Sequence, residues 1–311
     1  MASDENYAPY LCVCIYSILI HTNSNIQFYV LDGGIKDKSK ALINKSLSAF
    51  KHYSIEYLNM ANFNLNRFPN LKHYSLNTFS RYFIPELKPN LGKVLYLDVD
   101  IICKSDIVEL YNQDLQGFPL GAVLEDFYGL NGEYIKNHID SSFKSGKKSF
   151  NAGVMVLDIQ QFIARNYAKI LIEKTIALAD KLSCPDQDIF NIVFENNYKI
   201  LDYKFNFMID LYAQFEAVYP KKAKEIMRSP CIIHYVAHKP WQNRLSLGQK
   251  DFDEIASKTL FAKHISSSQN ATQNHKSSLL QKIFSIKNKD KIHKVITICG
   301  MQITIRRKLK K

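Results

Sequence analysis

The chain has 311 residues, is 46% hydrophobic and 23% charged, and carries a formal net charge of +12 at pH 7. That length and apolar content allow a substantial buried core, in one large domain or two. Its six cysteines lack Cys-x-x-Cys spacing, which argues against zinc motifs and is typical of a reduced cytosolic protein. The sequence shows no apolar run of the roughly 18 residues that a membrane-spanning helix needs. We therefore expect a cytoplasmic protein whose membrane contact is peripheral.

The positive charge is concentrated at the carboxyl end. Residues 271–311 hold eleven of the 41 basic residues and one of the 29 acidic residues, so the preceding body is nearly neutral. Apolar segments alternate with lysine clusters there, and such a tail can lie on an anionic bilayer, where each cation contributes roughly 1 kcal/mol. We divide the chain into a globular domain at 1–263, a linker at 264–278 and a basic amphipathic, membrane-associating tail at 279–311. The alternative is a disordered basic terminus without a role.

Hydrophobic periodicity predicts alternating helices and strands through the globular domain. In chain order we predict a helix at 7–21, a strand at 26–32, a helix at 37–50, a strand at 54–58, a helix at 78–87, a strand at 94–97, a short helix at 107–111, strands at 120–124 and 150–157, helices at 160–182 and 186–196, and strands at 199–203 and 231–236. Such alternation is typical of a mostly parallel sheet with helices on both faces. The sequence therefore predicts an α/β fold.

Two carboxylates directly follow one of these strands. Asp98-Val99-Asp100 comes after the apolar run 94–97, which places both acidic side chains at the carboxyl edge of a buried strand. Oxygens at such an edge can bind a hard divalent cation together with its phosphate ligands. Taken alone, the same pattern is also common at a solvated strand end.

Three further motifs make the pattern more specific. Phe150-Asn151-Ala152-Gly153 begins an apolar run, Pro185-Asp186-Gln187-Asp188 begins a predicted helix, and His234-Tyr235-Val236-Ala237-His238-Lys239-Pro240-Trp241 ends the last predicted strand. Four motifs in one order are far more specific than any one of them. Together they outline a nucleotide-sugar site.

With these motifs the chain resembles glycosyltransferase family 8 over residues 2–242, in particular its bacterial lipooligosaccharide and lipopolysaccharide galactosyl- and glucosyltransferases. The resemblance implies a single Rossmann-like nucleotide-diphospho-sugar transferase domain of the GT-A type, with a mixed sheet and helices on both faces. It also implies a UDP-hexose donor and Mn²⁺, with Mg²⁺ as the alternative cation. The expected reaction is retaining transfer of galactose or glucose to a lipid-linked oligosaccharide at the inner face of the inner membrane, without nucleic acid as a partner.

The resemblance assigns residues to the metal and the diphosphate. Asp98 and Asp100 match the family's metal-binding pair, and His234 matches the histidine that completes the protein ligands. Two carboxylates with one imidazole suit Mn²⁺ better than Mg²⁺, and the cation would stabilise the charge on departing UDP. Lys239 matches a phosphate-contacting lysine, and Ala237 stands where the family usually has glycine, which predicts weaker donor binding. The alternatives are a structural histidine and an ordinary surface lysine.

Other matches concern the nucleotide and the donor sugar. The residues expected to bind the donor, beyond the diphosphate residues above, are Ala2, Asp4, Asn6, Tyr7, Arg81, Val99, Asp126, Asn151 and Ala152. Asp4, Asn6 and Tyr7 match an Asp-x-Asn-Tyr element that holds uracil and ribose. His73 matches a histidine on the acceptor side. Each of these residues has the alternative of an ordinary hydrogen-bonded loop residue.

Asp186 and Gln187 match the pair beside the anomeric carbon. Retention of configuration requires either a nucleophile on the opposite face or an acceptor and leaving group on the same face. Because glutamine is a poor nucleophile, we expect same-face substitution. The amide oxygen of Gln187 would stabilise oxocarbenium charge, Asp186 would fix donor hydroxyls, and the departing phosphate oxygen would take the acceptor's proton.

The amino terminus departs from the family pattern. Family chains begin with an apolar strand that leads into the Asp-x-Asn-Tyr element, whereas Met1-Ala2-Ser3 is all that precedes Asp4 here. Loss of a central strand would leave ladder hydrogen bonds open on two neighbours. We therefore expect the first strand to be missing and the true start to lie upstream of Met1. The alternative is a truncated, catalytically impaired UDP-sugar-binding protein.

Two other functions are compatible with parts of the sequence. A metal-dependent phosphoester hydrolase could use the same carboxylate pair, but the sequence shows no clustered ligands for a second metal. A nucleic-acid-binding protein is suggested by the isoelectric point near 9.2. Against it, the body is nearly neutral and lacks a recognition motif.

Overall fold

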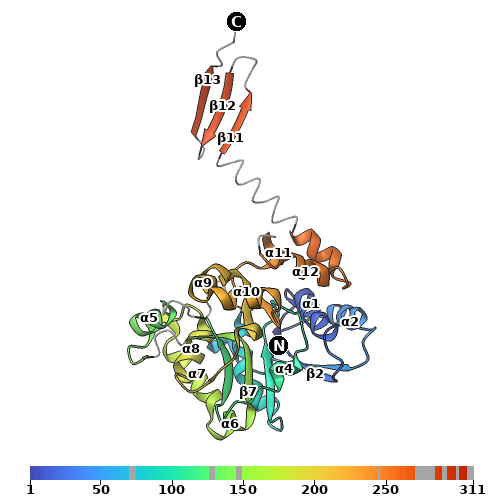
Figure 1. Ribbon diagram of the computed structural model, residues 1–311, viewed down its shortest axis with the longest axis vertical. Helices are drawn as coiled ribbons and strands as arrows, with labels where there is room; N and C mark the ends of the chain where they lie inside the picture. Colours follow the sequence, from blue (N-terminus) through green and yellow to red (C-terminus); the bar gives the residue numbers. More distant parts are fainter. Residues whose placement is uncertain are drawn as a thin grey trace.

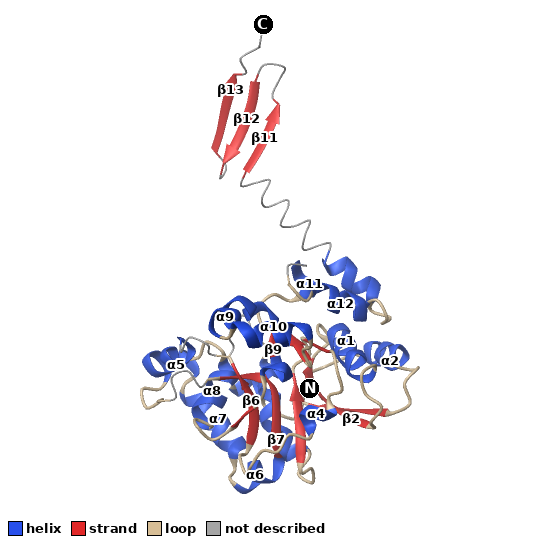
Figure 2. Cartoon of the chain, viewed as in Figure 1, coloured by secondary structure: helices blue, strands red, loops and turns tan. Residues whose placement is uncertain are grey.

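The computed structural model describes residues 1–69, 75–125, 130–144, 149–243 and 246–269 of the 311-residue chain. It also describes the backbone of three strands between residues 284 and 306. In the body of the protein, strands lie at the centre and helices cover them (Figure 1; Figure 2). The fold is mixed α/β, as the sequence predicted.

The elements follow one another in an order that alternates helix and strand through the first half. The strands of the body are β1 (Ala2–Ser3), β2 (Ile26–Asp32), β3 (Tyr53–Asn59), β4 (Lys93–Leu97), β5 (Ile101–Cys103), β6 (Leu120–Leu124), β7 (Phe150–Asp158), β8 (Lys199–Ile200), β9 (Phe207–Met208) and β10 (Ile232–His234). The α-helices are α1 (Ala8–Leu19), α2 (Asp37–Ser46), α3 (Ile84–Leu87), α4 (Val108–Tyr111), α5 (Leu130–Tyr134), α6 (Ile159–Ala164), α7 (Tyr167–Ala177), α8 (Pro185–Val193), α9 (Tyr212–Val218), α10 (Pro220–Arg228), α11 (Pro240–Asn243) and α12 (Gln249–Ala256).

The strands pair into separate sheets. β1, β2 and β3 are parallel neighbours, and β4, β7, β6 and β8 form a second sheet in that order. A third sheet has the order β5-β10-β9, in which β10 runs antiparallel to β5. β4 and β7 are also antiparallel, whereas β6 and β8 are parallel, so this sheet is mixed, as the sequence predicted.

β7 is buried over eight of its nine residues. Val154 and Val156 belong to one hydrophobic cluster, whereas Met155 and Leu157 belong to a second cluster. Because successive side chains of a strand point to opposite faces, β7 is covered on both sides. This placement fixes the start of β7, where Asn151 and Gly153 lie, inside the protein.

Several predicted elements are confirmed and one long helix is wrong. The strands predicted at 26–32 and 120–124 are observed as β2 and β6. The helix predicted at 160–182 is broken after Ala164, because Asn166 adopts a left-handed conformation with φ of 55° and a new helix, α7, begins at Tyr167. A left-handed residue cannot continue a right-handed helix, and asparagine tolerates that conformation better than most residues.

Two shorter predictions also need correction. Within the helix predicted at 78–87, the turn Leu76–Phe83 is 3₁₀-helical and α-helix is confined to α3. The strand predicted at 199–203 is limited to the two residues of β8, and a 3₁₀ turn (Tyr203–Asn206) follows.

The first part of the predicted linker belongs to the body. Residues 262–269 are helical, Ile265 is buried in the core, and the side-chain amide of Gln269 donates a hydrogen bond to the carbonyl oxygen of Pro240 at 3.1 Å. Residues 264–269 of the predicted linker are therefore part of this packed helix. The remaining linker residues from 270 onward lie outside the described residues.

The tail contains a three-stranded antiparallel sheet. Its strands are β11 (Phe284–Asn288), β12 (His293–Ile298) and β13 (Met301–Arg306), with β12 between the other two. Among the helices in the described ranges, none combines the length and apolar character that crossing a bilayer requires.

The first strand, which the sequence predicted to be missing, is present over two residues. Ala2 and Ser3 pair with the end of β2, and the amino group of Met1 donates to the carbonyl oxygen of Tyr29 at 3.1 Å. Beyond that point β2 and β4 face each other across a mostly apolar cavity of about 370 Å³, which also touches α4 and the end of α3. In the described part of the chain, β4 pairs with β7 alone.

This gap predicts an alternating pattern of amide protection. The observed hydrogen bonds place the amides of Phe28 and Tyr96 toward β3 and β7, whereas those of Tyr29 and Leu95 point into the gap. We expect the amides of Tyr29 and Leu95 to exchange at least about tenfold faster than those of Phe28 and Tyr96. Hydrogen exchange followed by NMR measures the difference, and equal protection within each pair would show that the gap is closed.

Candidate active site

Strand ends from both halves of the fold open into one cavity of about 650 Å³. The predicted site residues that line it are Ala2, Asp4, Tyr7, Arg81, Asp98, Val99, Asp100, Asn151, Ala152, Asp186, Gln187, His234, Ala237 and Lys239. Asn6 is exposed and is not part of this lining. Asp126 and His73 lie outside the described residues.

Three potential metal ligands converge in the cavity. Asp98, Asp100 and His234 offer ligand atoms that all lie within 4.8 Å of one another. The pairing of β5 with β10 brings them together, because His234 lies opposite Ile101 and the amide of Tyr235 donates to the carbonyl oxygen of Asp100 at 3.0 Å. A pair of carboxylates and one imidazole is a donor set that a divalent transition-metal cation can use.

Gly153 makes room for this cluster. The amide of Asp98 donates to the carbonyl oxygen of Gly153 at 2.7 Å, which holds the end of β4 against the start of β7. A Cβ atom at Gly153 would lie 2.6 Å from Asp98 Oδ2 and closer still to His234 Cε1. Atoms at such separations overlap, so these two side chains keep their positions only with glycine at residue 153.

The two carboxylates experience opposite electrostatic surroundings. Burial raises the pKa of Asp98, although the guanidinium of Arg81 opposes that change. Burial would also raise the pKa of Asp100, but the Lys239 ammonium and His234 outweigh it and bring the pKa well below its usual range. Lys239 forms an ion pair with Asp100 Oδ2, and His234 Nε2 lies 3.3 Å from Asp100 Oδ1. Asp100 is therefore a fully ionised group at neutral pH.

Arg81 joins three parts of the cavity wall. Its guanidinium lies 3.0 Å from Asp98 Oδ1 and 2.8 Å from Asp186 Oδ2, and it donates to the carbonyl oxygen of Ala152 at 2.8 Å. The guanidinium carbon also lies 4.2 Å from the centre of the Tyr96 ring. Since a planar guanidinium can bond several acceptors in fixed directions, Arg81 sets the distance between β4, β7 and α8.

The side chain of Gln187 is held by β7. Its Oε1 accepts hydrogen bonds from the Asn151 side-chain amide at 3.0 Å and from the Ala152 backbone amide at 3.1 Å. Asn151 also donates to Glu125 Oε2 at 2.9 Å. These contacts engage the oxygen that the sequence assigns to oxocarbenium stabilisation, and that assignment stays a prediction.

The loop after β10 brings Lys239 into the cavity, where its ammonium group contacts protein oxygens. Lys239 Nζ bonds Asp100 and the carbonyl oxygens of Tyr235 and Val236. The backbone amides of Ala237 and His238 donate to Asp210 Oδ2 at 3.1 Å and 3.2 Å. These two backbone N–H groups of the loop therefore have a carboxylate acceptor.

The amino-terminal motif forms a compact turn. Asp4 Oδ1 accepts hydrogen bonds from the backbone amides of Asn6 and Tyr7 at 3.0 Å and 3.2 Å. The half-buried ring of Tyr7 packs edge-on against Trp241, with 6.2 Å between ring centres. Tyr7 lines the cavity, whereas Asn6 contributes its backbone to the turn, and base stacking by Tyr7 stays a prediction.

Sequence reasoning missed four residues that shape the site. Glu125 lines the cavity next to the predicted Asp126, and the Tyr96 hydroxyl donates to Asp98 Oδ1 at 2.9 Å. Asp210 accepts the two loop amides, and Asn206 contacts His234 Nδ1 at 2.8 Å. Tyr96 lies within the apolar run before Asp98, where it has the pattern of a core residue; the other three carry no spacing signal.

Comparison with known proteins agrees with this geometry. The model of the glycosyl transferase family 8 matches residues 1–244. The chain belongs to glycosyltransferase family 8. Among solved structures, the galactosyltransferase LgtC in complex with donor and acceptor sugar analogs is 29% identical, with a TM-score of 0.70 over 83% of this chain and 95% of that chain.

Curated relatives in this family come from several bacteria. A putative glycosyltransferase of Haemophilus influenzae is 31% identical over 66% of this chain, and this chain spans 62% of its length. Glycosyltransferase GlyF of Streptococcus pneumoniae is 28% identical over 78% of this chain, which spans 56% of GlyF. The lipopolysaccharide 1,2-glucosyltransferase of Escherichia coli is 26% identical over 80% of this chain and 74% of its own length.

The role of Gly153 leads to a direct test. The Gly153→Ala variant should bind Mn²⁺ about 10- to 100-fold more weakly, because the added methyl displaces Asp98 and His234. Titration calorimetry of the full chain measures this affinity. Gly92→Ala is the matched control, since a Cβ at Gly92 meets nothing within 4 Å. Unchanged Mn²⁺ affinity in a folded Gly153→Ala protein would contradict the steric argument.

Proposed function

We propose that this family 8 glycosyltransferase transfers galactose or glucose from a UDP-sugar to a lipid-linked oligosaccharide, such as a lipopolysaccharide or lipooligosaccharide core, with retention of configuration. The observation that carries the proposal is the convergence of Asp98, Asp100 and His234 on one side of the cavity that also contains Asp186 and Gln187. A UDP-hexose needs a cation site for its diphosphate and, next to it, polar side chains for its sugar.

The three ligands fit a divalent cation, with Mn²⁺ favoured over Mg²⁺. The imidazole is a softer ligand than oxygen, which favours a transition metal, and Gly153 leaves the ligand atoms the space to converge. When bound, the cation would supply Lewis-acid stabilisation of the negative charge on the diphosphate. Asp98 and Asp100 are placed to hold it with their carboxylates and His234 with Nε2.

The protein's cations are placed for the diphosphate side of the reaction. Lys239 is a mobile point charge on a flexible stem, so its ammonium can turn from Asp100 toward a bound phosphate. Arg81 is held by Asp98 and Asp186 and serves as a fixed positive charge between the metal ligands and the sugar side. Both charges would favour UDP as a leaving group.

The sugar side favours same-face substitution. Asp186 is buried and paired with Arg81 at 2.8 Å, which makes its carboxylate a weaker nucleophile. Gln187 is an uncharged amide fixed by Asn151 and Ala152. We therefore assign donor-hydroxyl binding to Asp186 and charge stabilisation beside the anomeric carbon to Gln187, with the leaving phosphate oxygen as proton acceptor.

The relatives support the hexose and the acceptor class. LgtC is a galactosyltransferase, and the Escherichia coli relative is a lipopolysaccharide 1,2-glucosyltransferase. The alternative is a UDP-sugar-binding protein with impaired catalysis. It is favoured by the pairing of the Ala237 and His238 amides with Asp210, which takes two donors away from phosphate.

The tail supports association with an anionic membrane. Its register aligns Phe284 with Ile298 and Met301, and Ile286 with Ile296 and Ile303, while the row between contains polar residues. Together with the cationic sequence, this pattern favours a tail at 279–311 that keeps the catalytic domain at the inner face of the inner membrane.

The metal assignment predicts the effect of a single isosteric change. Asp100→Asn removes a ligand charge without changing size, and we expect cation-dependent UDP release from UDP-galactose or UDP-glucose to fall by at least about 100-fold. Asp180→Asn, at an exposed position, is the control and should leave the rate unchanged. Equal rates in the two variants, or turnover insensitive to a chelator, would contradict the assignment. Donor binding without any turnover in the unmodified chain would support the impaired alternative.

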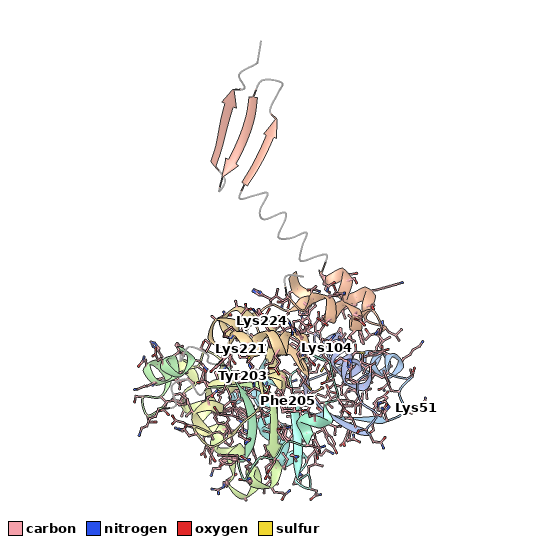
Figure 3. The ribbon with its side chains drawn as sticks, in the orientation of Figure 1. Lys51, Lys104, Tyr203, Phe205, Lys221 and Lys224 are labelled. Atoms are coloured by element: carbon pink, nitrogen blue, oxygen red, sulfur yellow. The ribbon has the colours of Figure 1, made fainter. Side chains whose placement is uncertain are left out.

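If the tail binds membranes, removing cations from the tail should weaken vesicle binding more than removing cations from the body. Replacing Arg306, Arg307 and Lys308 with glutamine removes three tail cations, which at about 1 kcal/mol each should weaken binding to phosphatidylserine vesicles about 100-fold. The control replaces Lys51, Lys221 and Lys224 on the body, labelled in Figure 3, with glutamine. Equal losses in the two proteins in a sedimentation assay would contradict a dedicated tail.

A further inference from the structure

A chain of buried side-chain amides leads from the metal cluster to Gln187. Asn206 Oδ1 lies 2.8 Å from His234 Nδ1, and Asn206 Nδ2 donates to Asn151 Oδ1 at 2.9 Å. Asn151 Nδ2 donates in turn to Gln187 Oε1 at 3.0 Å. Asn206 is 0% exposed and His234 is 2% exposed, so water does not compete for these bonds.

Backbone amides determine how each amide in this chain is oriented. The amide of Gly153 donates to Asn151 Oδ1 at 3.0 Å, and a backbone N–H can only donate. The oxygen of Asn151 therefore faces Gly153 and Asn206, and its Nδ2 faces Gln187. At the other end, the backbone amide of Ala152 donates to Gln187 Oε1, which identifies that atom as oxygen as well.

The orientation of Asn206 then determines which nitrogen of His234 carries a hydrogen. Because Asn151 Oδ1 accepts, Asn206 must direct its Nδ2 toward Asn151 and its Oδ1 toward His234. An amide oxygen can only accept, so His234 Nδ1 must be the donor. In a neutral imidazole the lone pair is then on Nε2, the nitrogen that faces Asp100.

We propose that Asn206 is a positioning residue that holds His234 as the Nδ1–H tautomer, with Nε2 presented to a divalent cation. The proposal rests on the proposed function, in which His234 is a metal ligand. A hydrogen bond to the distal nitrogen fixes the ring orientation and raises the basicity of a ligating histidine. The same hydrogen-bonded amides fix the positions of both His234 and Gln187 relative to the backbone of β7.

The local fold explains why this amide is available. Asn206 ends a 3₁₀ turn whose neighbours Tyr203 and Phe205 (Figure 3) pack into the core, and Phe207 begins β9 immediately after it. β9 pairs in parallel with β10, with Phe207 opposite Ile233 and Met208 opposite His234. This pairing places the polar side chain of Asn206 beside the imidazole of His234 among apolar neighbours.

The test uses the full chain labelled with ¹⁵N-histidine. ¹⁵N NMR shows which ring nitrogens carry a hydrogen, and the spectrum of His234→Gln identifies the His234 signals among the nine histidines. We expect a hydrogen on His234 Nδ1 in the unmodified chain and its loss in Asn206→Leu. Mn²⁺ affinity, measured by paramagnetic resonance of the free ion, should fall about 10- to 100-fold in Asn206→Leu.

Two further variants separate positioning from general destabilisation. Asn206→Asp keeps an oxygen acceptor for Nδ1–H and should restore the tautomer. Thr175→Val removes another buried hydrogen-bonding group, which bonds Tyr82 and Leu171 and not the amide chain, and should leave the tautomer and Mn²⁺ affinity unchanged. An Nε2–H tautomer in the unmodified chain, or a folded Asn206→Leu protein with unchanged tautomer and Mn²⁺ affinity, would overturn the proposal. If the unmodified chain binds no Mn²⁺, the metal role of His234 fails, while the NMR result still reports on Asn206.

Discussion

The site depends on the balance of charges that the fold buries at its strand ends. Asp98, Asp100 and Asp186 lie around one cavity, and Arg81 and Lys239 compensate them. Removing one member of a buried ion pair typically costs about 3–5 kcal/mol, whereas a whole domain is stable by only about 5–15 kcal/mol. The arrangement of β4, β7, β10 and α8 is therefore tied to the same ionic contacts that make the cavity chemically useful.

Strands were predicted well where an apolar run is long and bounded by polar residues. The limits of β2 and β6 agree with the sequence because both are mostly apolar runs whose residues contribute to both hydrophobic clusters. The break at Asn166 could not be predicted, because 160–182 keeps a helical pattern and a single left-handed residue separates α6 from α7. β5 was missed because its three residues directly follow Asp100 and are too few to show a period.

Site residues that belong to a sequence motif could be predicted, whereas residues that join the site only through tertiary contacts could not. Asp98, Asp100 and His234 converge as the family resemblance implied, although 134 residues separate Asp100 from His234. Asn206 and Asp210 lie in short 3₁₀ turns that are too brief to show a periodicity, so their partners became visible only in the folded chain. β1 is the opposite case. The departure of the amino terminus from the family pattern was evident in the sequence, but the pairing of two residues with β2 became visible only in the structure.

We propose that three protein side chains share one divalent cation beside the diphosphate of a UDP-sugar. Anomalous diffraction at the manganese edge, from crystals grown with Mn²⁺ and UDP, would locate this cation. We expect one peak within about 2.5 Å of carboxylate oxygens of Asp98 and Asp100 and of Nε2 of His234. UDP bound in the cavity with its manganese ion away from all three side chains would contradict it.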